Sequence, residues 1–241
     1  MMVINFAIVM FMYRWLGQYG ILLWIPIAVI IANIQVIKAI EIFGISATLG
    51  NIVYGTTFLV TDILSENHGK KAARLAVYIG FISLIALTVL MNIAIAFIPS
   101  AGDFSQPHIK GIFLLMPRIA IGSLIAYFIS QLHDVSSYAF WLKRFPSMRM
   151  IWLRNLASTI LSQAMDTLVF TTIAFWGVFD KQVFWEIVLT TYLLKAIVAL
   201  CDTPMVYLAR KWFDNDEIQQ KWKKRIAKFA LEGINSSDQT N

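Results

Sequence analysis

Residues 74–98 read RLAVYIGFISLIALTVLMNIAIAFI, an apolar run in which Arg74, at its start, is the single charged residue. About 20 apolar residues in a helix cross the hydrocarbon core of a bilayer, so this stretch predicts a transmembrane helix. Residues 184–209 form a second long run of this kind. Only helices or closed barrels satisfy their backbone in hydrocarbon, and these runs are too long and too continuously apolar for barrel strands. The sequence therefore predicts an all-α, polytopic transmembrane helical bundle.

Composition supports the same class. The chain has 241 residues, of which 59% are hydrophobic and 14% charged, and its mean hydropathy is +0.68. These values are typical of membrane proteins that cross the bilayer several times. Breaks rich in glycine, proline and charge divide the chain into hydrophobic segments. The predicted segments are at about residues 2–16, 21–42, 46–66, 72–98, 109–138, 149–178 and 184–211.

Three parts of the chain follow from these segments. Residues 1–20 are predicted to be an extra N-terminal transmembrane segment, residues 21–211 the transmembrane core, and residues 212–241 a basic cytoplasmic tail. The first segment lacks the basic start and small-residue cleavage pattern of a signal peptide, so we interpret it as a retained span. The single cysteine, Cys201, excludes an intramolecular disulfide.

The distribution of charge predicts the topology and the setting. The formal net charge is +6, but the cationic residues gather in alternate connections between segments. Cytoplasmic loops carry an excess of Lys and Arg, so this pattern predicts seven crossings in the cytoplasmic membrane, with the N-terminus outside and the C-terminus inside. A basic tail beside a membrane is typical of contact with lipid headgroups, and nucleic-acid binding is not expected. The basic residues are Arg14, Lys70, Lys71, Arg74, Lys143, Arg144, Arg149, Arg210, Lys211 and those of the tail.

Several of the predicted helices carry a polar face. At 100° per residue, Asn51, Tyr54, Asp62 and Glu66 fall on one side of the third segment. Similar polar stripes occur on the fifth, sixth and seventh segments. Four polar stripes on neighbouring helices indicate an internal polar cavity. Single Ser and Thr residues are more simply interpreted as hydrogen bonds between helices.

A phrase of the form Ser-Gln-x-x-Asp occurs twice inside apolar segments, at 130–134 and 162–166. Ionisable residues at membrane depth are costly and are candidates for function. With a rise of 1.5 Å per residue, Asp134 lies near the cytoplasmic interface, level with Arg154. A structural salt bridge between them is as good an interpretation as a ligand role. Asp166 lies near the midplane, where either Arg118 or Lys195 could pair with it, and a functional role is favoured.

The sequence lacks the residue sets of several enzyme classes. It has no H-E-x-x-H helix and no His pair with metal-ligand spacing, and no P-loop for ATP hydrolysis. No histidine is placed to activate a serine in mid-membrane. We therefore predict a non-enzymatic protein with no cofactor and no metal, and transport is favoured over chemistry.

Several ordered motifs resemble the queuosine precursor transporter family, also called the vitamin uptake transporter family. The resemblance covers about residues 21–211. The first motif runs from Gly50 to Arg74 and contains Asn51, Tyr54, Phe58-Leu59, Thr61-Asp62-Ile63, Glu66 and Gly69-Lys70-Lys71. The others are Arg118-Ile119 followed by Ser130-Gln131-x-x-Asp134-Val135, Trp152-Leu153-Arg154-Asn155 followed by Ser162-Gln163-x-x-Asp166-Thr167, Ile173-Ala174-Phe175-Trp176-Gly177, and Tyr192-x-x-Lys195 followed by Thr203-Pro204-x-x-Tyr207.

The resemblance implies uptake of cyano- or aminomethyl-deazaguanine across the cytoplasmic membrane. It also implies a six-helix core similar to the substrate-binding subunits of energy-coupling-factor importers, to which residues 2–16 are an addition. A deazaguanine base offers donors that suit a carboxylate and an acceptor that suits an amide or a cation. We therefore predict two groups of site residues. The substrate-binding group is Asn51, Tyr54, Gln131, Asn155, Gln163 and Asp166, and the gating or ion-pair group is Asp62, Glu66, Arg118, Asp134, Arg154 and Lys195.

Other functions remain open from the sequence. The chain could be the substrate-binding subunit of an ATP-driven importer, with a separate ATPase module as partner, or a carrier of another heterocycle. A membrane enzyme or a scaffold fits less well, since an enzyme would be expected to carry His, Cys or a metal cluster in mid-membrane. The sequence assigns neither the energy coupling nor a homo-oligomeric state.

Overall fold

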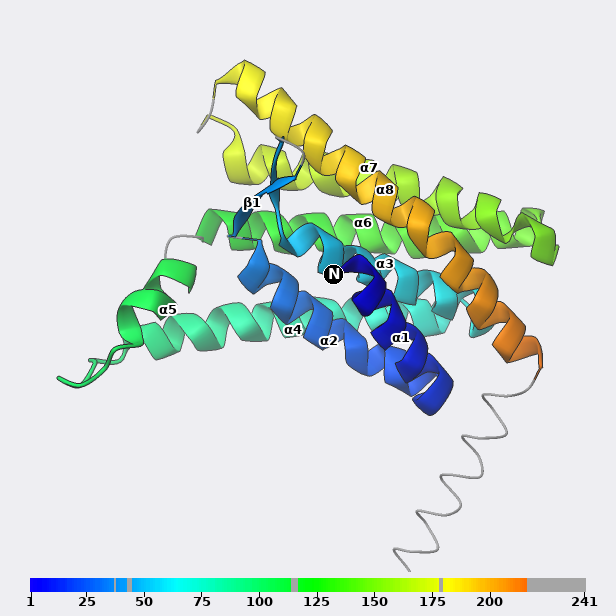
Figure 1. Ribbon diagram of the computed structural model, residues 1–241, viewed down its shortest axis with the longest axis horizontal. Coiled ribbons are helices and arrows are strands. Elements are labelled where there is room, and N and C mark those ends of the chain that lie inside the picture. The colour runs from blue at the N-terminus through cyan, green and yellow to red at the C-terminus, as the bar shows by residue number, and fades with distance from the viewer. Residues whose placement is uncertain (37, 43–44, 114–116, 178–179, 216–241) are drawn as a thin grey trace, which may run out of the picture.

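The computed structural model describes residues 1–36, 38–42, 45–113, 117–177 and 180–215. They form a bundle of long helices with one short hairpin (Figure 1), which confirms the predicted helical membrane bundle. The basic residues predicted for the tail beyond residue 215 lie outside the described residues. The elements are α1 (Met2–Leu16), α2 (Gln18–Gln35), β1 (Ala39–Ile42), β2 (Ile45–Thr48), α3 (Gly50–Asn67), α4 (Lys70–Ala96), α5 (Gln106–Phe113), α6 (Pro117–Arg144), the 3-10 turn η1 (Met148–Met150), α7 (Ile151–Phe175) and α8 (Lys181–Asp214).

The hairpin and the start of α6 differ from the prediction. The second segment was expected to stay helical to residue 42, but α2 ends at Gln35 and antiparallel strands follow, with Ala39 opposite Thr48. Their sequence is rich in β-branched residues, which favour strands over helix. The fifth segment is divided into α5 and α6, and α6 begins at Pro117. Proline suits a first helical turn and disfavours the interior.

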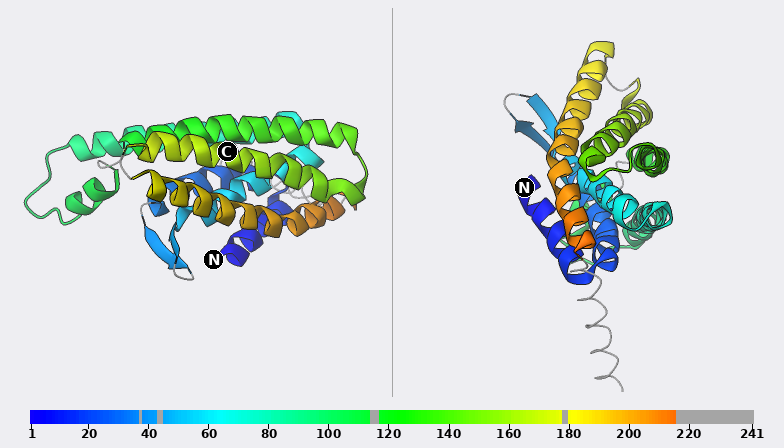
Figure 2. Two further views of the ribbon diagram at one scale, coloured as in Figure 1. Left: turned by 90° about the horizontal axis from the view of Figure 1, so that it is seen from above. Right: turned by 90° about the vertical axis from the view of Figure 1, so that its right-hand side faces the viewer.

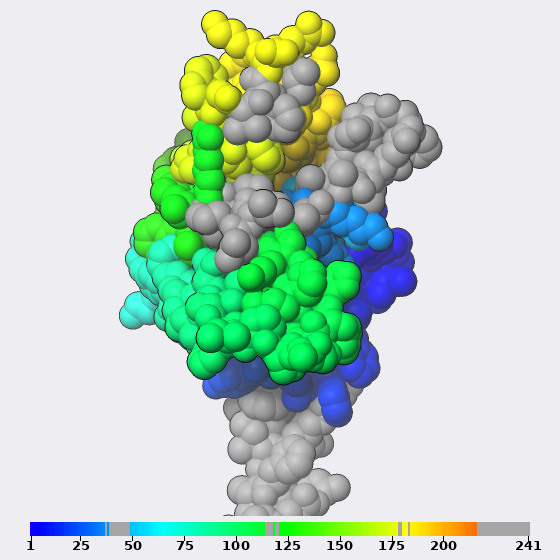
Figure 3. All heavy atoms as spheres, turned by 90° about the vertical axis from the view of Figure 1, so that its left-hand side faces the viewer, coloured from blue at the N-terminus to red at the C-terminus, as the bar shows by residue number. Residues whose placement is uncertain are grey.

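The two ends of the bundle have different character. At one end lie the α1–α2, α3–α4 and α6–α7 connections and the end of α8, which together hold the basic residues of the predicted cytoplasmic loops. We call this the basic end. The opposite end, called the hairpin end, carries β1–β2 and α5. Helix α5 projects from it in Figure 2 and, with the end of α4, forms much of the surface seen in Figure 3.

Helix α3 is the central helix of the bundle. It packs against α1, α2, α4, α6 and α8, and nearly all its side chains are buried, including Asp62 and Glu66. The outward faces of the surrounding helices carry large apolar residues, such as Ile82, Leu90 and Leu193. Polar groups inside and apolar groups outside are what a lipid environment requires. Within the residues that the structure describes, three helices are long and apolar enough to cross a membrane by length and composition, namely α2, α4 and α8.

Close helix packing at two glycines brings the polar faces together. A Cβ at Gly55 on α3 would lie 2.6 Å from a methyl group of Val198 on α8. One at Gly80 on α4 would lie 2.0 Å from the hydroxyl of Tyr127 on α6. Both distances are shorter than any ordinary contact, so glycine lets α3 approach α8 at Gly55 and leaves room for the Tyr127 hydroxyl at Gly80. The approach at Gly55 sets α3 and α8, which carry Tyr54 and Lys195, side by side.

Helix α1 packs on the bundle at the basic end. Its buried residues are mostly apolar and face α2, α3 and α8. The hydroxyl of Tyr13 accepts a hydrogen bond from Asn67 Nδ2 at 2.8 Å and lies 3.2 Å from His68 Nε2. The N-terminal helix is therefore tied to the end of α3.

Candidate functional site

A cavity of about 480 Å³, part of it continuous with the outside, lies between the helices in the half of the bundle nearer the hairpin end. Six helices contribute to its wall, namely α2, α3, α4, α6, α7 and α8. Apolar and aromatic groups form most of the wall, with a few convergent polar groups, which is typical of a small-molecule site. Its polar and aromatic lining residues are Asn33, Asn51, Tyr54, Ser123, Tyr127, Asp166, Phe170 and Lys195.

Asp166 is the centre of the polar part of this wall. Its Oδ1 accepts hydrogen bonds from Tyr54 Oη at 2.6 Å and from Ser130 Oγ at 3.0 Å. Its Oδ2 forms an ion pair with Lys195 Nζ. Lys195 Nζ also lies 5.2 Å from the centre of the Tyr54 ring, within the range of a cation–π contact. Opposite charges, a hydroxyl and an aromatic face are therefore held together at the cavity wall.

The ion pair is almost fully buried. The side chains of Asp166 and Lys195 are 4% and 3% exposed. A buried ion pair is stabilising only when hydrogen bonds satisfy its other atoms, and Tyr54 and Ser130 satisfy Asp166 in this way. The cavity wall therefore presents a carboxylate and an ammonium group beside an aromatic ring.

The structure brings together three of the six residues predicted to bind substrate. Asn51, Tyr54 and Asp166 line the cavity, but Gln131, Asn155 and Gln163 do not. Gln131 Nε2 donates to Thr57 Oγ1 at 2.8 Å, and Asn155 lies deeper, toward the basic end. Gln163 is 1% exposed and sits one helical turn before Asp166. The helical-wheel argument placed these amides on the polar faces, but it does not show which neighbouring helix each one meets.

The cavity wall also includes residues of α2 and α4, two helices that supplied no residue to the predicted substrate-binding group. Val29, Ala32 and Asn33 on α2 and Leu84 on α4 form part of the wall. The only sequence signal for α2 is Asn33, a polar residue in an otherwise apolar helix. Its side-chain nitrogen donates to the backbone of Val29 at 2.9 Å.

Three buried carboxyl groups form a second polar level, between the cavity and the basic end. We call Asp62, Asp134 and Asp202 the acidic layer. Thr159 Oγ1 lies 3.0 Å from Asp62 Oδ2 and 3.3 Å from Asp134 Oδ1. Asn155 Nδ2 donates to Asp202 Oδ1 at 2.9 Å. The acidic residues come from α3, α6 and α8, and α7 supplies the hydroxyl and amide groups between them.

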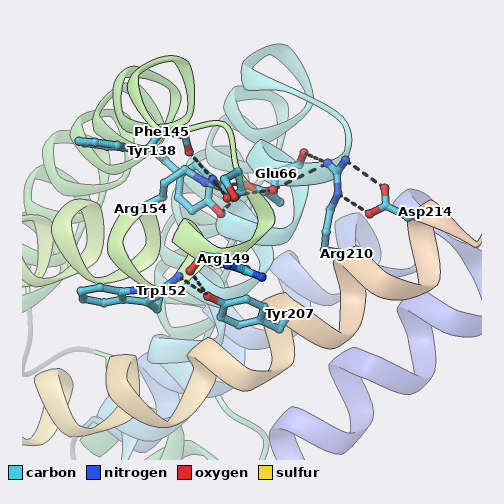
Figure 4. A network of polar contacts seen from close by, with 10 residues as sticks. Glu66, Tyr138, Phe145, Arg149, Trp152, Arg154, Tyr207, Arg210 and Asp214 are labelled. Carbon is cyan, nitrogen blue, oxygen red and sulfur yellow. Dashed lines mark hydrogen bonds and ion pairs between the residues drawn. The ribbon is translucent and has the colours of Figure 1, made fainter.

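The third level is an ion network at the basic end (Figure 4), and it corrects one predicted pair. Arg154 contacts Glu66 and not Asp134: its Nη2 and Nε lie 2.6 and 3.1 Å from the two carboxylate oxygens. Arg154 Nη1 donates to the carbonyls of Phe145 and Ser147 at 2.5 and 2.8 Å. The expectation that Arg154 lies level with Asp134 was wrong: Arg154 lies nearer the basic end, facing α3 and the α6–α7 connection, and Asp134 lies in the acidic layer.

Glu66 has further partners in this network. Tyr138 Oη donates to Glu66 Oε2 at 2.9 Å, and Arg210 Nη1 lies 3.8 Å from Oε1 and 3.1 Å from the Glu66 backbone oxygen. Figure 4 shows Arg210 between Glu66 and Asp214. The network therefore joins α3, α6, α7 and α8 at the basic end. A bidentate Arg–carboxylate pair, in which two N–H groups of the guanidinium donate to the two carboxylate oxygens, is among the strongest polar contacts.

Arg118, the remaining residue of the ion-pair group, lies at the hairpin end. It is exposed and donates to the backbone oxygens of Ile173 and Trp176, at 2.5 and 2.6 Å. These carbonyls belong to the last turn of α7, where no intrahelical donor is left. Of the two cations predicted for Asp166, the structure pairs it with Lys195, and Arg118 instead links the start of α6 to the end of α7. Within the described residues, no three His, Cys, Asp or Glu side chains are grouped to hold a metal ion.

The fold and the site define a class: a polytopic helical membrane protein with a small-molecule cavity and buried charge pairs inside the bundle. A family model described as a putative vitamin uptake transporter matches residues 48–209, and the chain belongs to this family.

Two relatives share most of their length with this chain. A "Probable queuosine precursor transporter" of Bacillus subtilis (strain 168) is 44% identical over 215 residues, which are 89% of this chain and 94% of that protein. A "Queuosine precursor transporter" of Escherichia coli (strain K12) is 26% identical over 190 residues, 76% of this chain and 83% of that protein. No solved structure matches the chain.

Proposed function

We propose that the protein imports queuosine precursors, which are deazaguanine bases, and binds them in the cavity beside Asp166. The names of its relatives support the class of solute. The observation that carries the proposal is the group formed by Tyr54, Asp166 and Lys195 at the cavity wall. The mostly apolar and aromatic wall with a few convergent polar groups is typical of a site for a small molecule.

The chemistry of the base matches these side chains. Its amino group and ring N–H are neighbouring donors, which suit the carboxylate of Asp166, and its carbonyl oxygen suits the ammonium of Lys195. The planar rings can stack on an aromatic face, and Tyr54, Tyr127 and Phe170 lie in the wall. Ligand binding would then exchange some Asp166 contacts for contacts to the base.

The charge of the wall favours the cyano form of the precursor. Of the described residues that line the cavity, Asp166 is the only acid, and Lys195 already balances its charge. The aminomethyl form carries an additional cation and would need a second carboxylate. We therefore expect cyano-deazaguanine to bind more tightly than aminomethyl-deazaguanine.

The distribution of basic residues supports an orientation. By the positive-inside rule, the basic end faces the cytoplasm, the N-terminus lies outside and the C-terminus inside. The cavity then lies in the outer half of the bundle, while the acidic layer and the ion network lie between it and the cytoplasm. This corresponds to an outward-facing state of a carrier. A tag-accessibility experiment with cysteines placed in the α5 and α6–α7 regions would test the orientation.

Uptake in cells tests the function. Cells unable to synthesise queuosine precursors, given this protein, should accumulate labelled cyano-deazaguanine, and Asp166→Asn should abolish most of that uptake. Glu186→Gln is a matched control, because Glu186 is exposed and, within the described part of the chain, its carboxylate is hydrogen-bonded to the neighbouring exposed Gln182. Unchanged uptake by a well-expressed Asp166→Asn protein would contradict the site assignment. Absence of uptake by the unaltered protein would contradict the function.

A further inference from the structure

The acidic layer is placed between the cavity and the basic end. Along α3, Asp62 follows Tyr54 by eight residues, which is about 12 Å at 1.5 Å per residue. On α8, Asp202 follows Lys195 by seven residues. Any solute that passes from the cavity to the basic end must pass this level. The layer therefore lies on the route that the proposed function requires.

The three carboxyl groups of this layer have no cationic partner within the described part of the chain. All three residues are 0% exposed. The cations nearest along the helices are already paired: Arg154 and Arg210 contact Glu66, and Lys195 contacts Asp166. Buried ionised carboxylates without partners are strongly disfavoured, and such groups take up protons instead.

Asp62 and Asp134 meet at a single hydroxyl group. Thr159 Oγ1 lies 3.0 Å from Asp62 Oδ2 and 3.3 Å from Asp134 Oδ1. Ionised carboxylates only accept hydrogen bonds, and the hydroxyl has one proton to donate. Thr159 therefore satisfies one of the two acids, and a proton bound to the other acid would complete the arrangement.

Unpartnered oxygens show where further protons would go. One oxygen of each acidic residue is buried without a hydrogen-bond partner. The amide of Asn155 reaches into the layer through the bond from its Nδ2 to Asp202. Its Oδ1 is buried and also has no donor. A buried acceptor without a donor, next to carboxyl groups, is a partner for the O–H of a protonated acid.

A partly exposed histidine lies beside the layer. His133 precedes Asp134 on α6, and its Nδ1 lies 2.9 Å from Ser162 Oγ, which also donates to the Ser158 backbone oxygen at 2.8 Å. Asp, Glu and His residues gathered inside a bundle are typical of proton pathways in transporters. Other titratable groups on the elements around the layer include Tyr54, Glu66, Tyr127, Tyr138, Arg154, Asp166, Lys195, Cys201 and Arg210, with Tyr13, Arg14, Tyr19, Lys70, Lys71, Arg74 and Tyr78 on α1, α2 and α4.

We propose that Asp62 and Asp134, with Asp202 beside them, form a proton-binding site that couples movement of the solute to the proton gradient. This inference rests on the proposed function. In each cycle, at least one proton enters with the solute from the hairpin side and leaves with it at the basic end. The layer packs as seen here when the proton is bound. Loss of the proton leaves facing carboxylates that repel one another, which favours a different helix arrangement.

Transport by the purified full-length protein in lipid vesicles tests the coupling. With the vesicle interior about one pH unit more alkaline, coupling of one proton to one solute should concentrate labelled cyano-deazaguanine about tenfold. A protonophore should abolish this accumulation. Asp62→Asn and Asp134→Asn mimic the protonated side chain. They should keep exchange of labelled for unlabelled base and lose the accumulation, whereas Glu186→Gln should keep both.

Two outcomes separate the inference from the function on which it rests. If the base exchanges but the pH gradient produces no accumulation, the coupling is overturned and the proposed function stands. If the unaltered protein neither binds nor exchanges the base, the proposed function fails.

Infrared spectroscopy tests the proton site without any solute. At neutral pH the protein should show a carboxylic acid carbonyl band that weakens in Asp62→Asn and in Asp134→Asn. Absence of that band from the unaltered protein would overturn the proton site.

Discussion

Asp166 on α7 and Asp134 on α6 each end a Ser-Gln-x-x-Asp phrase, and the two helices pack against each other in antiparallel directions. The surroundings of the two phrases differ: Ser130 donates to Asp166 at 3.0 Å, whereas Ser162 donates to the Ser158 backbone oxygen at 2.8 Å. The two acids also differ in what the third helix supplies. Helix α8 sets Lys195 against Asp166, and α3 brings Asp62 to Thr159, which also contacts Asp134. The same phrase thus ends in an ion pair in one place and in a pair of buried acids in the other.

The largest expected effect separates the two acids by their charge. Asp166→Asn leaves Lys195 buried without its partner, and such a loss costs about 3–5 kcal/mol of unfolding free energy. In our proposal Asp134 and Asp62 hold a proton between them. Asp134→Asn puts a neutral group of the same shape in this place, so a cost under about 1 kcal/mol is expected. Thermal unfolding in detergent measures both. Asp166→Asn combined with Lys195→Met should recover part of the loss. Equal destabilisation by the two single substitutions would contradict the distinction.

A double-mutant cycle tests the pairing of Arg154. The changes in unfolding free energy caused by Arg154→Met and by Glu66→Gln should be strongly non-additive, with a coupling energy of about 1–3 kcal/mol. Arg154→Met and Asp134→Asn should add to within about 0.5 kcal/mol, because the structure gives them no direct contact. The measurement is the free energy of unfolding of each single and double variant. Strong coupling of Arg154 with Asp134 would restore the pair predicted from depth alone.

The two serines offer a finer test of the same comparison. Ser130→Ala removes a hydrogen bond to an ionised carboxylate, for which a cost of about 1.5–3 kcal/mol is typical. Ser162→Ala removes bonds to uncharged partners, the Ser158 backbone oxygen and the His133 ring, and about 0.5–1.5 kcal/mol is expected. Chemical or thermal unfolding of the two variants, side by side, decides the order. A larger loss for Ser162→Ala would contradict the assignment of the ionised acid to the Ser130 side.

The smallest effect is a pH dependence outside the membrane segments. Burial lowers the pKa of His68, next to the end of α3, to about 4. The unfolded chain binds this proton near pH 6.5, so stability should fall as the pH decreases from about 6.5 toward 4. His68→Gln should remove the share of this decrease in stability that His68 causes. Melting temperatures of both proteins between pH 4 and 7 measure the decrease, and identical slopes of melting temperature against pH would contradict the assignment.

Much of the fold could be predicted from hydropathy because lipid imposes long apolar helices and marks their ends with glycine, proline and charge. The predicted ends near Gly69 and Pro146 agree with the ends of α3 and α6. The β1–β2 hairpin was missed because its residues are as apolar as a helix end. A local preference for strand decides its structure.

The site was predicted only where a residue's height in the bundle was enough. Asn51, Tyr54 and Asp166 line the cavity, and Lys195 was one of two cations named for Asp166. Arg154 was paired with the wrong acid, because counting residues from a segment midpoint set it level with Asp134 and gave no direction for its side chain. Direction depends on which helices touch, and that is decided by close packing, as at Gly55. The wall contributed by α2 has almost no signal in its apolar sequence.

Direct binding to the purified protein tests the central claim, that the cavity beside Asp166 holds a deazaguanine base. Titration calorimetry with cyano-deazaguanine and guanine should show saturable binding of the deazaguanine. Asp166→Asn should weaken it on the order of thirtyfold or more, since loss of one partner of a buried charge pair costs about 2 kcal/mol or more. Glu186→Gln should bind as the unaltered protein does. Equal affinity of the unaltered protein and of folded Asp166→Asn for the base would contradict the account.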